Sequence, residues 1–268
     1  MNRRFPRILT ACVLGVLTAL TACATATAPA PSAPGRPATQ ASSEAPAAQA
    51  PAALKAGQAT GDSMPRYRPP AQQSTGPARL LSSRTRNVGE AALAIAVIAP
   101  DHTGLTTQSQ PTLYWYASQP VSGRVAVTIQ DKRGIEPPVE KQLTLSEAVG
   151  MIPVRLADLG VQLRPGNEYR WSVVVVADSP KQPRSLLTSG TIRQTDRRDT
   201  IQAHLSSLPP ERAAFLLAEQ GLWYDALAQL GELIERAPAE PRWRHYRAAL
   251  LEQVGLNAAA QFDRRDLR

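Results

Sequence analysis

The sequence predicts an α+β protein in which an antiparallel β-sandwich precedes a small helical module. Three observations predict this order. Short segments of alternating apolar and polar residues fill 89–195, and apolar residues recur at helical spacing in 200–268. The stretch before residue 89 is rich in Ala, Pro and Ser and has neither pattern. With 268 residues, the chain has room for one or two such domains.

Residues 1–22 have the features of a signal peptide. Arg3, Arg4 and Arg7 form a basic start, and the apolar run from Ile8 to Leu20 follows it. At about 13 residues, this run is too short to span a bilayer but suits the apolar core of a secretory leader. We therefore expect export from the cytoplasm.

The leader ends in Leu20–Cys23 (Leu-Thr-Ala-Cys), which resembles the lipobox of bacterial lipoproteins. The resemblance implies cleavage before Cys23 and lipid on its thiol, and several acyl chains would anchor the protein firmly. Because Ala24 follows the cysteine, the resemblance also implies the outer membrane, with the protein facing the periplasm. The alternative is an ordinary secretory leader that is cleaved near Ala26 or Ala28.

Residues 23–88 are expected to form a disordered Ala/Pro-rich linker behind the lipidated cysteine. Positions 24–88 contain ten prolines and lack the apolar periodicity needed to bury a face. Seven basic and two acidic residues give the linker a net charge of +5, whereas 89–268 holds 20 of each and is neutral. A basic stripe with interleaved aromatic residues is missing from the sequence of the neutral part, so we expect no nucleic-acid partner.

Seven strands are expected in 89–195, separated by Gly, Pro, Asn and Asp at the spacing of a β-sandwich. Val125, Val127 and Ile129 fall on one face of a half-buried strand. The segment 168–177 is apolar on both faces, which favours a central position. The predicted strands are 92–98, 112–117, 123–130, 139–145, 150–156, 168–177 and 187–194.

The segment Leu163–Tyr169 resembles the tyrosine corner of immunoglobulin-like and fibronectin type III sandwiches. In that corner, a tyrosine hydroxyl bonds to the backbone a few residues upstream. The resemblance makes the domain at 89–195 an immunoglobulin-like β-sandwich. It would lack a disulfide, because Cys12 and Cys23 are the only cysteines in the chain.

A charged hinge is expected at 195–200, followed by three helices. Pro209 and Pro210 favour a helix start, and Gly221 favours its end. Further helices are predicted over 222–236 and 242–254.

The two helix breaks lie 34 residues apart. Leu217, Gly221, Leu222 and Ala226 are followed at that distance by Leu251, Gly255, Leu256 and Ala260, and Ala214 corresponds to Ala248. This period is typical of tetratricopeptide repeats, with small residues where helices touch and Gly at the turn. We therefore expect a tetratricopeptide-like helical module at 200–268. Its second copy is polar after Ala260, and two units are few for such an array, so we expect it to lean on the sandwich.

Side chains suited to catalysis do not fall into a recognisable motif. His102, His204 and His245 have unrelated contexts and no metal-ligand spacing, so we expect no enzyme, no metal and no cofactor. Asp225 has three interpretations: a carboxylate that lines a helical groove, a helix N-terminal acid favoured by the helix dipole, or a bond that holds the junction between sandwich and helices. The run 263–266 (Asp-Arg-Arg-Asp) is expected to form surface ion pairs of little energetic value.

Two sets of aromatic residues are candidates for binding. Tyr114, Trp115 and Tyr116 could line a sugar-binding face, although consecutive strand residues cannot all face one way, which favours core packing. The helical groove is the expected partner-binding surface, and its residues are Trp223, Tyr224, Asp225, Trp243, Arg244, Tyr246 and Arg247.

Three segments together resemble the bacterial domain-of-unknown-function family 928. They are 111–116 (Pro-Thr-Leu-Tyr-Trp-Tyr), 165–171 (Pro-Gly-x-x-Tyr-x-Trp) and 221–227 (Gly-Leu-Trp-Tyr-Asp-Ala-Leu). The resemblance covers about 85–257. It implies secretion and this architecture, and no activity is assigned to the family.

We therefore expect a non-catalytic envelope lipoprotein that acts as a protein-interaction or scaffold module. Its expected partners are the membrane, through lipid on Cys23, and another envelope protein. The alternatives are a peptidoglycan- or carbohydrate-binding surface module, and an enzyme whose site the sequence does not reveal.

Overall fold

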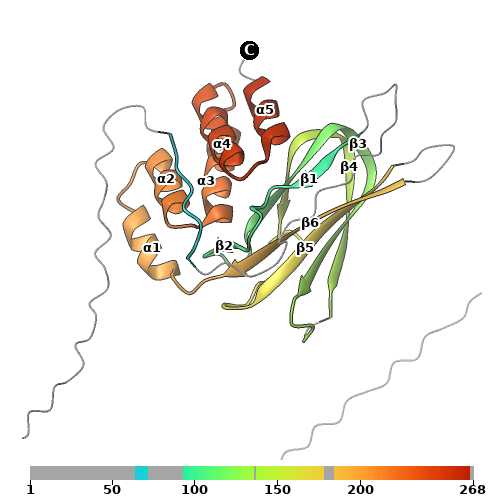
Figure 1. Ribbon diagram of the computed structural model, residues 1–268, viewed down its shortest axis with the longest axis horizontal. Coiled ribbons are helices and arrows are strands. Elements are labelled where there is room, and N and C mark those ends of the chain that lie inside the picture. The colour runs from blue at the N-terminus through green and yellow to red at the C-terminus, as the bar shows by residue number, and fades with distance from the viewer. Residues whose placement is uncertain (1–63, 72–92, 136, 178–183, 266–268) are drawn as a thin grey trace, which may run out of the picture. The chain divides into compact units, whose positions relative to one another are not determined.

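Strands precede helices in the part of the chain that the structure describes (Figure 1). The computed structural model describes residues 64–71, 93–135, 137–177 and 184–265. The strands are β1 (Ile95–Val97), β2 (Gly104–Thr106), β3 (Thr112–Asp131), β4 (Val139–Arg155), β5 (Glu168–Ala177) and β6 (Arg184–Gln194). The helices are α1 (Arg198–Leu205), α2 (Pro210–Glu219), α3 (Trp223–Arg236), α4 (Pro241–Gln253) and α5 (Asn257–Arg265). The prediction of an α+β fold with β before α is confirmed.

Most of the N-terminal predictions lie outside the described residues. The signal peptide, Cys23 and most of the linker are among them, so those predictions stay predictions. None of the helices in the described ranges is long and apolar enough to cross a membrane.

The six described strands belong to one mixed sheet. Its hydrogen-bonded order is β1-β3-β5-β6-β2, and β4 pairs with β3. The pairing of β2 with β6 is parallel, and the other pairings are antiparallel. The short strand β2 is absent from the sequence prediction, because its sequence Gly-Leu-Thr contains a single apolar side chain and shows no alternation.

The long strands β3 and β4 curl the sheet. The first part of β3 pairs with β1 and its second part with β5, while β4 accompanies both parts. The register shifts twice between Ala117 and Gly123, and such bulges bend a strand. The prediction of separate strands at 112–117 and 123–130, and at 139–145 and 150–156, is therefore wrong, because bulges rather than turns join each pair.

The curl brings β1 across β6 and encloses a core. The Val97 N–H donates to Thr188 Oγ1 at 3.0 Å, and a Cβ added to Gly190 would lie only 2.6 Å from the Ala99 Cβ. Trp115 and Trp171 are fully buried in this core.

The predicted tyrosine-corner bond is confirmed locally, since the Arg164 N–H donates to the Tyr169 hydroxyl at 3.2 Å.

The helices begin earlier and continue later than predicted. The helix α1 occupies part of the expected charged hinge, and α5 continues past Ala260, where the sequence pattern becomes polar. The predicted helices 222–236 and 242–254 correspond to α3 and α4 within about one residue. Helices α2 and α3 pack together, as do α4 and α5, and both α3 and α5 contact the sheet.

The 34-residue correspondence holds in the geometry of the turns. Gly221 and Gly255 have φ values of 74° and 73°, a left-handed conformation that glycine adopts without strain. In each turn, the residue after the glycine donates its N–H to the carbonyl five residues earlier at 2.9 Å (Leu222 to Leu217, Leu256 to Leu251). This is a Schellman motif in both copies. Ala226 and Ala260, one turn later, are both fully buried.

Met64–Ala71, hereafter the strap, packs against the helices although it lies within the predicted linker (cyan in Figure 1). Tyr67 is buried, and the Arg68 N–H donates to the Ala218 carbonyl of α2 at 3.1 Å. The expectation of disorder is wrong for these eight residues, because their contacts come from distant parts of the chain that composition does not reveal.

Candidate functional site

The first turn of α3 enters the junction between sheet and helices. Trp223, Tyr224 and Asp225 follow the Gly221 turn, and their exposed fractions are 0%, 1% and 7%. An amphipathic surface helix would expose one of three consecutive residues. Here all three are covered, because α3 packs on β2, β3 and the neighbouring helices, and the strap reaches Trp223.

Trp223 and Tyr224 each make specific hydrogen bonds to the sheet region. The Trp223 Nε1–H donates to the Ile98 carbonyl at 3.0 Å. The Tyr224 hydroxyl donates to the Thr191 carbonyl and accepts from Trp171 Nε1–H, both at 3.0 Å. Burial raises the pKa of Tyr224 well above its usual range, so this phenol is a neutral structural group.

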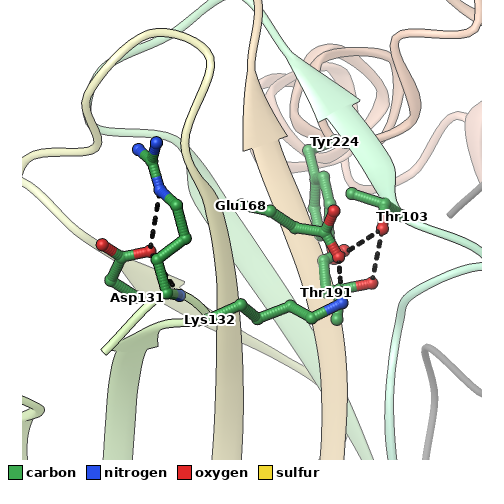
Figure 2. A network of polar contacts seen from close by, with 7 residues as sticks. Thr103, Asp131, Lys132, Glu168, Thr191 and Tyr224 are labelled. Carbon is green, nitrogen blue, oxygen red and sulfur yellow. Dashed lines mark hydrogen bonds and ion pairs between the residues drawn. The ribbon is translucent and has the colours of Figure 1, made fainter. Parts of the chain in front are cut away.

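A chain of polar contacts leads from Tyr224 to Lys132, whose side chain is partly exposed (Figure 2). Thr191 Oγ1–H donates to Thr103 Oγ1 at 3.2 Å, and Thr103 Oγ1–H donates to Glu168 Oε1 at 2.9 Å. The Lys132 ammonium closes the chain with a contact of 2.5 Å to the same carboxylate oxygen. These contacts connect β5, β6 and α3 through side chains and are a structural feature of the fold.

Asp225 joins α3 to the end of β2 through three hydrogen bonds. Thr106 Oγ1–H donates to its Oδ1 at 2.5 Å, and the Thr107 N–H and Oγ1–H donate to its Oδ2 at 2.8 and 2.7 Å. These contacts match the interpretation of Asp225 as a bond that holds the junction. The residue also stands in the first turn of α3 and lines the groove between α1, α2 and α3, so the three interpretations do not exclude one another. Burial raises the pKa of Asp225, and the hydrogen bonds from Thr106 and Thr107 oppose that rise without cancelling it.

The raised pKa of Asp225 predicts a pH effect on stability. The folded protein holds the proton more tightly than the unfolded chain, so the stabilisation is present at low pH. It is lost as pH rises from about 4 through the raised value. Asp225→Asn stays neutral at every pH. We therefore expect wild type to lose stability relative to Asp225→Asn as pH rises from 4 to 8 in chemical unfolding. The raised pKa of Asp225 would be contradicted if the difference in unfolding free energy between wild type and Asp225→Asn did not change with pH, or changed in the other direction.

The remaining residues of the predicted groove do not form an open surface. Trp243 is buried, and its partner Tyr246 packs on Phe215 with ring centroids 4.9 Å apart. The half-buried Arg244 donates to the Pro238 carbonyl at 2.6 Å. The structure thus places Trp223, Tyr224, Trp243 and Arg247 in the interior, whereas the nearly buried Asp225 is among the residues that line an open groove beside the junction.

Arg247 and Asp263 form a buried ion pair between α4 and α5. The Arg247 Nε–H and Nη2–H donate to Asp263 Oδ2 and Oδ1 at 2.7 and 2.6 Å. The two side chains are 7% and 1% exposed. The prediction that Asp263 belongs to a surface ion-pair run is therefore wrong. Charge alternation alone could not show that α5 continues and turns this residue inward.

The strand aromatics pack inside the protein. Tyr114, Trp115 and Tyr116 are all buried, and the Tyr116 ring lies 5.9 Å from Phe262 of α5. The sheet packs against the helices on one face and encloses its own core on the other, so both faces of this segment are covered. This excludes an exposed sugar-binding face made by these three residues.

Two open grooves lie beside the junction. The first, hereafter the amide groove, has a volume of about 480 Å³ and runs between α1, α2, α3 and the loop before β3. Four glutamines are among its lining residues, Gln108, Gln110, Gln202 and Gln229. The second has about 640 Å³ and lies along the strap beside Arg193 and Arg197. In the described ranges, no cluster of three His, Cys, Asp or Glu residues is placed to hold a metal.

Sequence reasoning missed the residues that contact the strap. Tyr67 forms a hydrogen bond of 2.9 Å with His102, and its N–H donates to Gln253 Oε1 at 2.8 Å. One signal could have indicated this site, since Tyr67 is the single aromatic residue between residues 23 and 88. A proline-rich disordered linker has no need of a lone tyrosine.

The comparisons with known proteins give one finding. Residues 79–263 match the family described as Domain of Unknown Function (DUF928). A search of curated proteins found no match. Because the family match spans more than half of the chain, the chain belongs to this family, as the three sequence segments indicated.

Proposed function

We propose that this DUF928 protein is a non-catalytic lipoprotein of the cell envelope that binds another protein through its helical module. Lipid on Cys23 would anchor it in the outer membrane, facing the periplasm, and the linker would hold the folded part away from the bilayer. In this proposal the sheet domain is an immunoglobulin-like sandwich and the helices are tetratricopeptide-like. Metabolic lipid label that is equal in wild type and Cys23→Ala would contradict the anchor.

The amide groove is the observation that carries the proposal. It is lined by α1 and by the helical pair α2 and α3. The matching turns at Gly221 and Gly255 support a repeat-type module. Such modules bind partners along the concave surface that their stacked helices create. Glutamine carboxamides both donate and accept, so a glutamine-lined groove suits the backbone of an extended peptide.

A photo-cross-linker at Gln229 tests this surface in intact cells. Benzoylphenylalanine at Gln229, within the groove, is expected to give a discrete adduct with one envelope protein. The matched control is the same probe at Gln130, an exposed position on β3 away from the groove lining. The interaction surface would be misplaced if both positions gave the same adducts, or if Gln229 gave none in a folded, expressed protein.

The alternative, a peptidoglycan- or carbohydrate-binding module, has less support. It was expected to use the basic linker and the strand aromatics together. Because Tyr114, Trp115 and Tyr116 are buried, the linker alone would have to supply that binding.

A further inference from the structure

The strap lies on the helices as an extended peptide whose side chains alternate. Pro65 and Tyr67 are buried, whereas Arg66 and Arg68 are exposed. The Gln253 side chain contacts two points of its backbone: Oε1 accepts from the Tyr67 N–H at 2.8 Å, and Nε2–H donates to the Pro65 carbonyl at 2.9 Å. A third backbone bond joins the Arg68 N–H to the Ala218 carbonyl at 3.1 Å. These contacts bind the strap by its main chain.

One specific pocket receives the Tyr67 side chain. Its ring stacks on His102 with centroids 5.8 Å apart and meets the edge of Trp223 at 4.9 Å. The hydroxyl lies 2.9 Å from His102 Nε2, and His102 Nδ1 lies 3.2 Å from the Asp101 carboxylate. In the tautomer with its hydrogen on Nδ1, which faces the Asp101 carboxylate, His102 Nε2 accepts a hydrogen bond from the phenol. The pocket therefore selects tyrosine over phenylalanine.

Gly221 provides the surface on which the strap backbone rests. A Cβ added there would lie 2.8 Å from the Arg68 carbonyl oxygen, closer than real Cβ contacts. The turn of the first helical pair thus has two reasons to be glycine, its left-handed φ of 74° and the strap above it. This close approach shows a groove shaped to an extended chain.

We propose that this strap groove is a docking site for extended peptides of the type Pro-x-Tyr-x-Pro, and that its occupant in trans is the strap of a second copy of the chain. Main-chain bonds combined with side-chain pockets are one of the recurring ways in which proteins bind extended peptides. The sequence known to fit is 64–71 of this chain, and every further copy carries it. The strap is joined to the rest of the chain through the 21 residues at 72–92, which could span at most about 70 Å. This length would let the strap reach the groove of a second copy anchored beside it.

This inference rests on the proposed function, because it names the partner of the same helical module. It uses a different surface from the amide groove, so the two can fail separately. In a single chain the strap occupies its own groove at a high effective concentration and competes with any strap in trans. A test must therefore empty the groove first.

The first measurement uses a fluorescent peptide with the sequence of residues 64–71. Its fluorescence anisotropy measures the affinity with which it binds full-length chains. Tyr67→Ala empties the groove and is expected to bind the peptide at least about tenfold more tightly than wild type. Adding Gln253→Ala removes two hydrogen bonds and should weaken that binding about tenfold. Arg66→Ala changes an exposed strap residue and should behave like wild type. Circular dichroism checks that each variant is folded.

The second measurement identifies the occupant by mixing complementary chains. Tyr67→Ala offers a groove without a strap, and Gln253→Ala offers a strap with a weakened groove, so sedimentation should show a 1:1 complex of the two. The double variant mixed with Tyr67→Ala should stay monomeric. Folded Tyr67→Ala that does not bind the peptide would overturn the docking site. Peptide binding without a heterodimer would overturn the second copy as its occupant.

Discussion

Trp223→Ala is expected to lower the free energy of unfolding by about 3–5 kcal/mol, the usual cost of removing a large buried aromatic side chain. Trp223 is fully buried, and its indole is the contact shared by α3, the strap and the loop after β1. Truncation would leave a cavity at this point. It would also leave the Ile98 carbonyl without the donor that it has now.

The matched variant is Trp223→Phe, which keeps a ring beside Tyr67 and loses the indole N–H. It should cost clearly less than the alanine, because most of the apolar contact remains. Urea unfolding of both variants measures the difference. A loss below about 1 kcal/mol for Trp223→Ala, or an equal loss for both variants, would contradict the packing of this junction.

The burial of Trp223 also shows which parts of the fold the sequence can predict. The helical spacing of apolar residues, with proline and glycine at the helix ends, predicted α2, α3 and α4. The 34-residue period identified the two equivalent turns at Gly221 and Gly255. These are local signals, and each depends on a few neighbouring residues. The spacing of apolar residues does not show which part of the protein covers a helix. The sequence therefore assigns Trp223 and Tyr224 to a groove, although they face the sheet and the strap.

The parts that sequence reasoning missed depend on distant contacts. The strap has no regular pattern, and it is held by Gln253 and Ala218, which lie more than 140 residues away. The long strands β3 and β4 cross polar and glycine-containing stretches that look like turns, because bulges tolerate such residues. The sequence could not show that the Asp225 carboxylate bonds to Thr106 and Thr107, because these residues lie 119 and 118 positions away in the chain.

A second large effect is expected at the ion pair between α4 and α5. Asp263→Ala should lower the free energy of unfolding by about 3–5 kcal/mol, because it leaves the Arg247 guanidinium buried without its carboxylate. The penalty comes from the uncompensated charge more than from the lost attraction. Replacing both residues by apolar side chains of similar size, Arg247→Met with Asp263→Leu, should therefore recover much of the loss.

The same two helices provide the control for this argument. Arg264 of α5 also holds a carboxylate of α4 with two bonds, to Glu252 at 3.1 and 2.8 Å, but both side chains are about 40% exposed. Water solvates either partner when the other is removed, so Glu252→Ala should cost only about 0–1 kcal/mol. Unfolding measurements on Asp263→Ala and Glu252→Ala thus compare pairs of similar geometry that differ in burial. Equal costs would show that burial does not decide the stability of this interface, and a large cost for Asp263→Ala alone would show that it does.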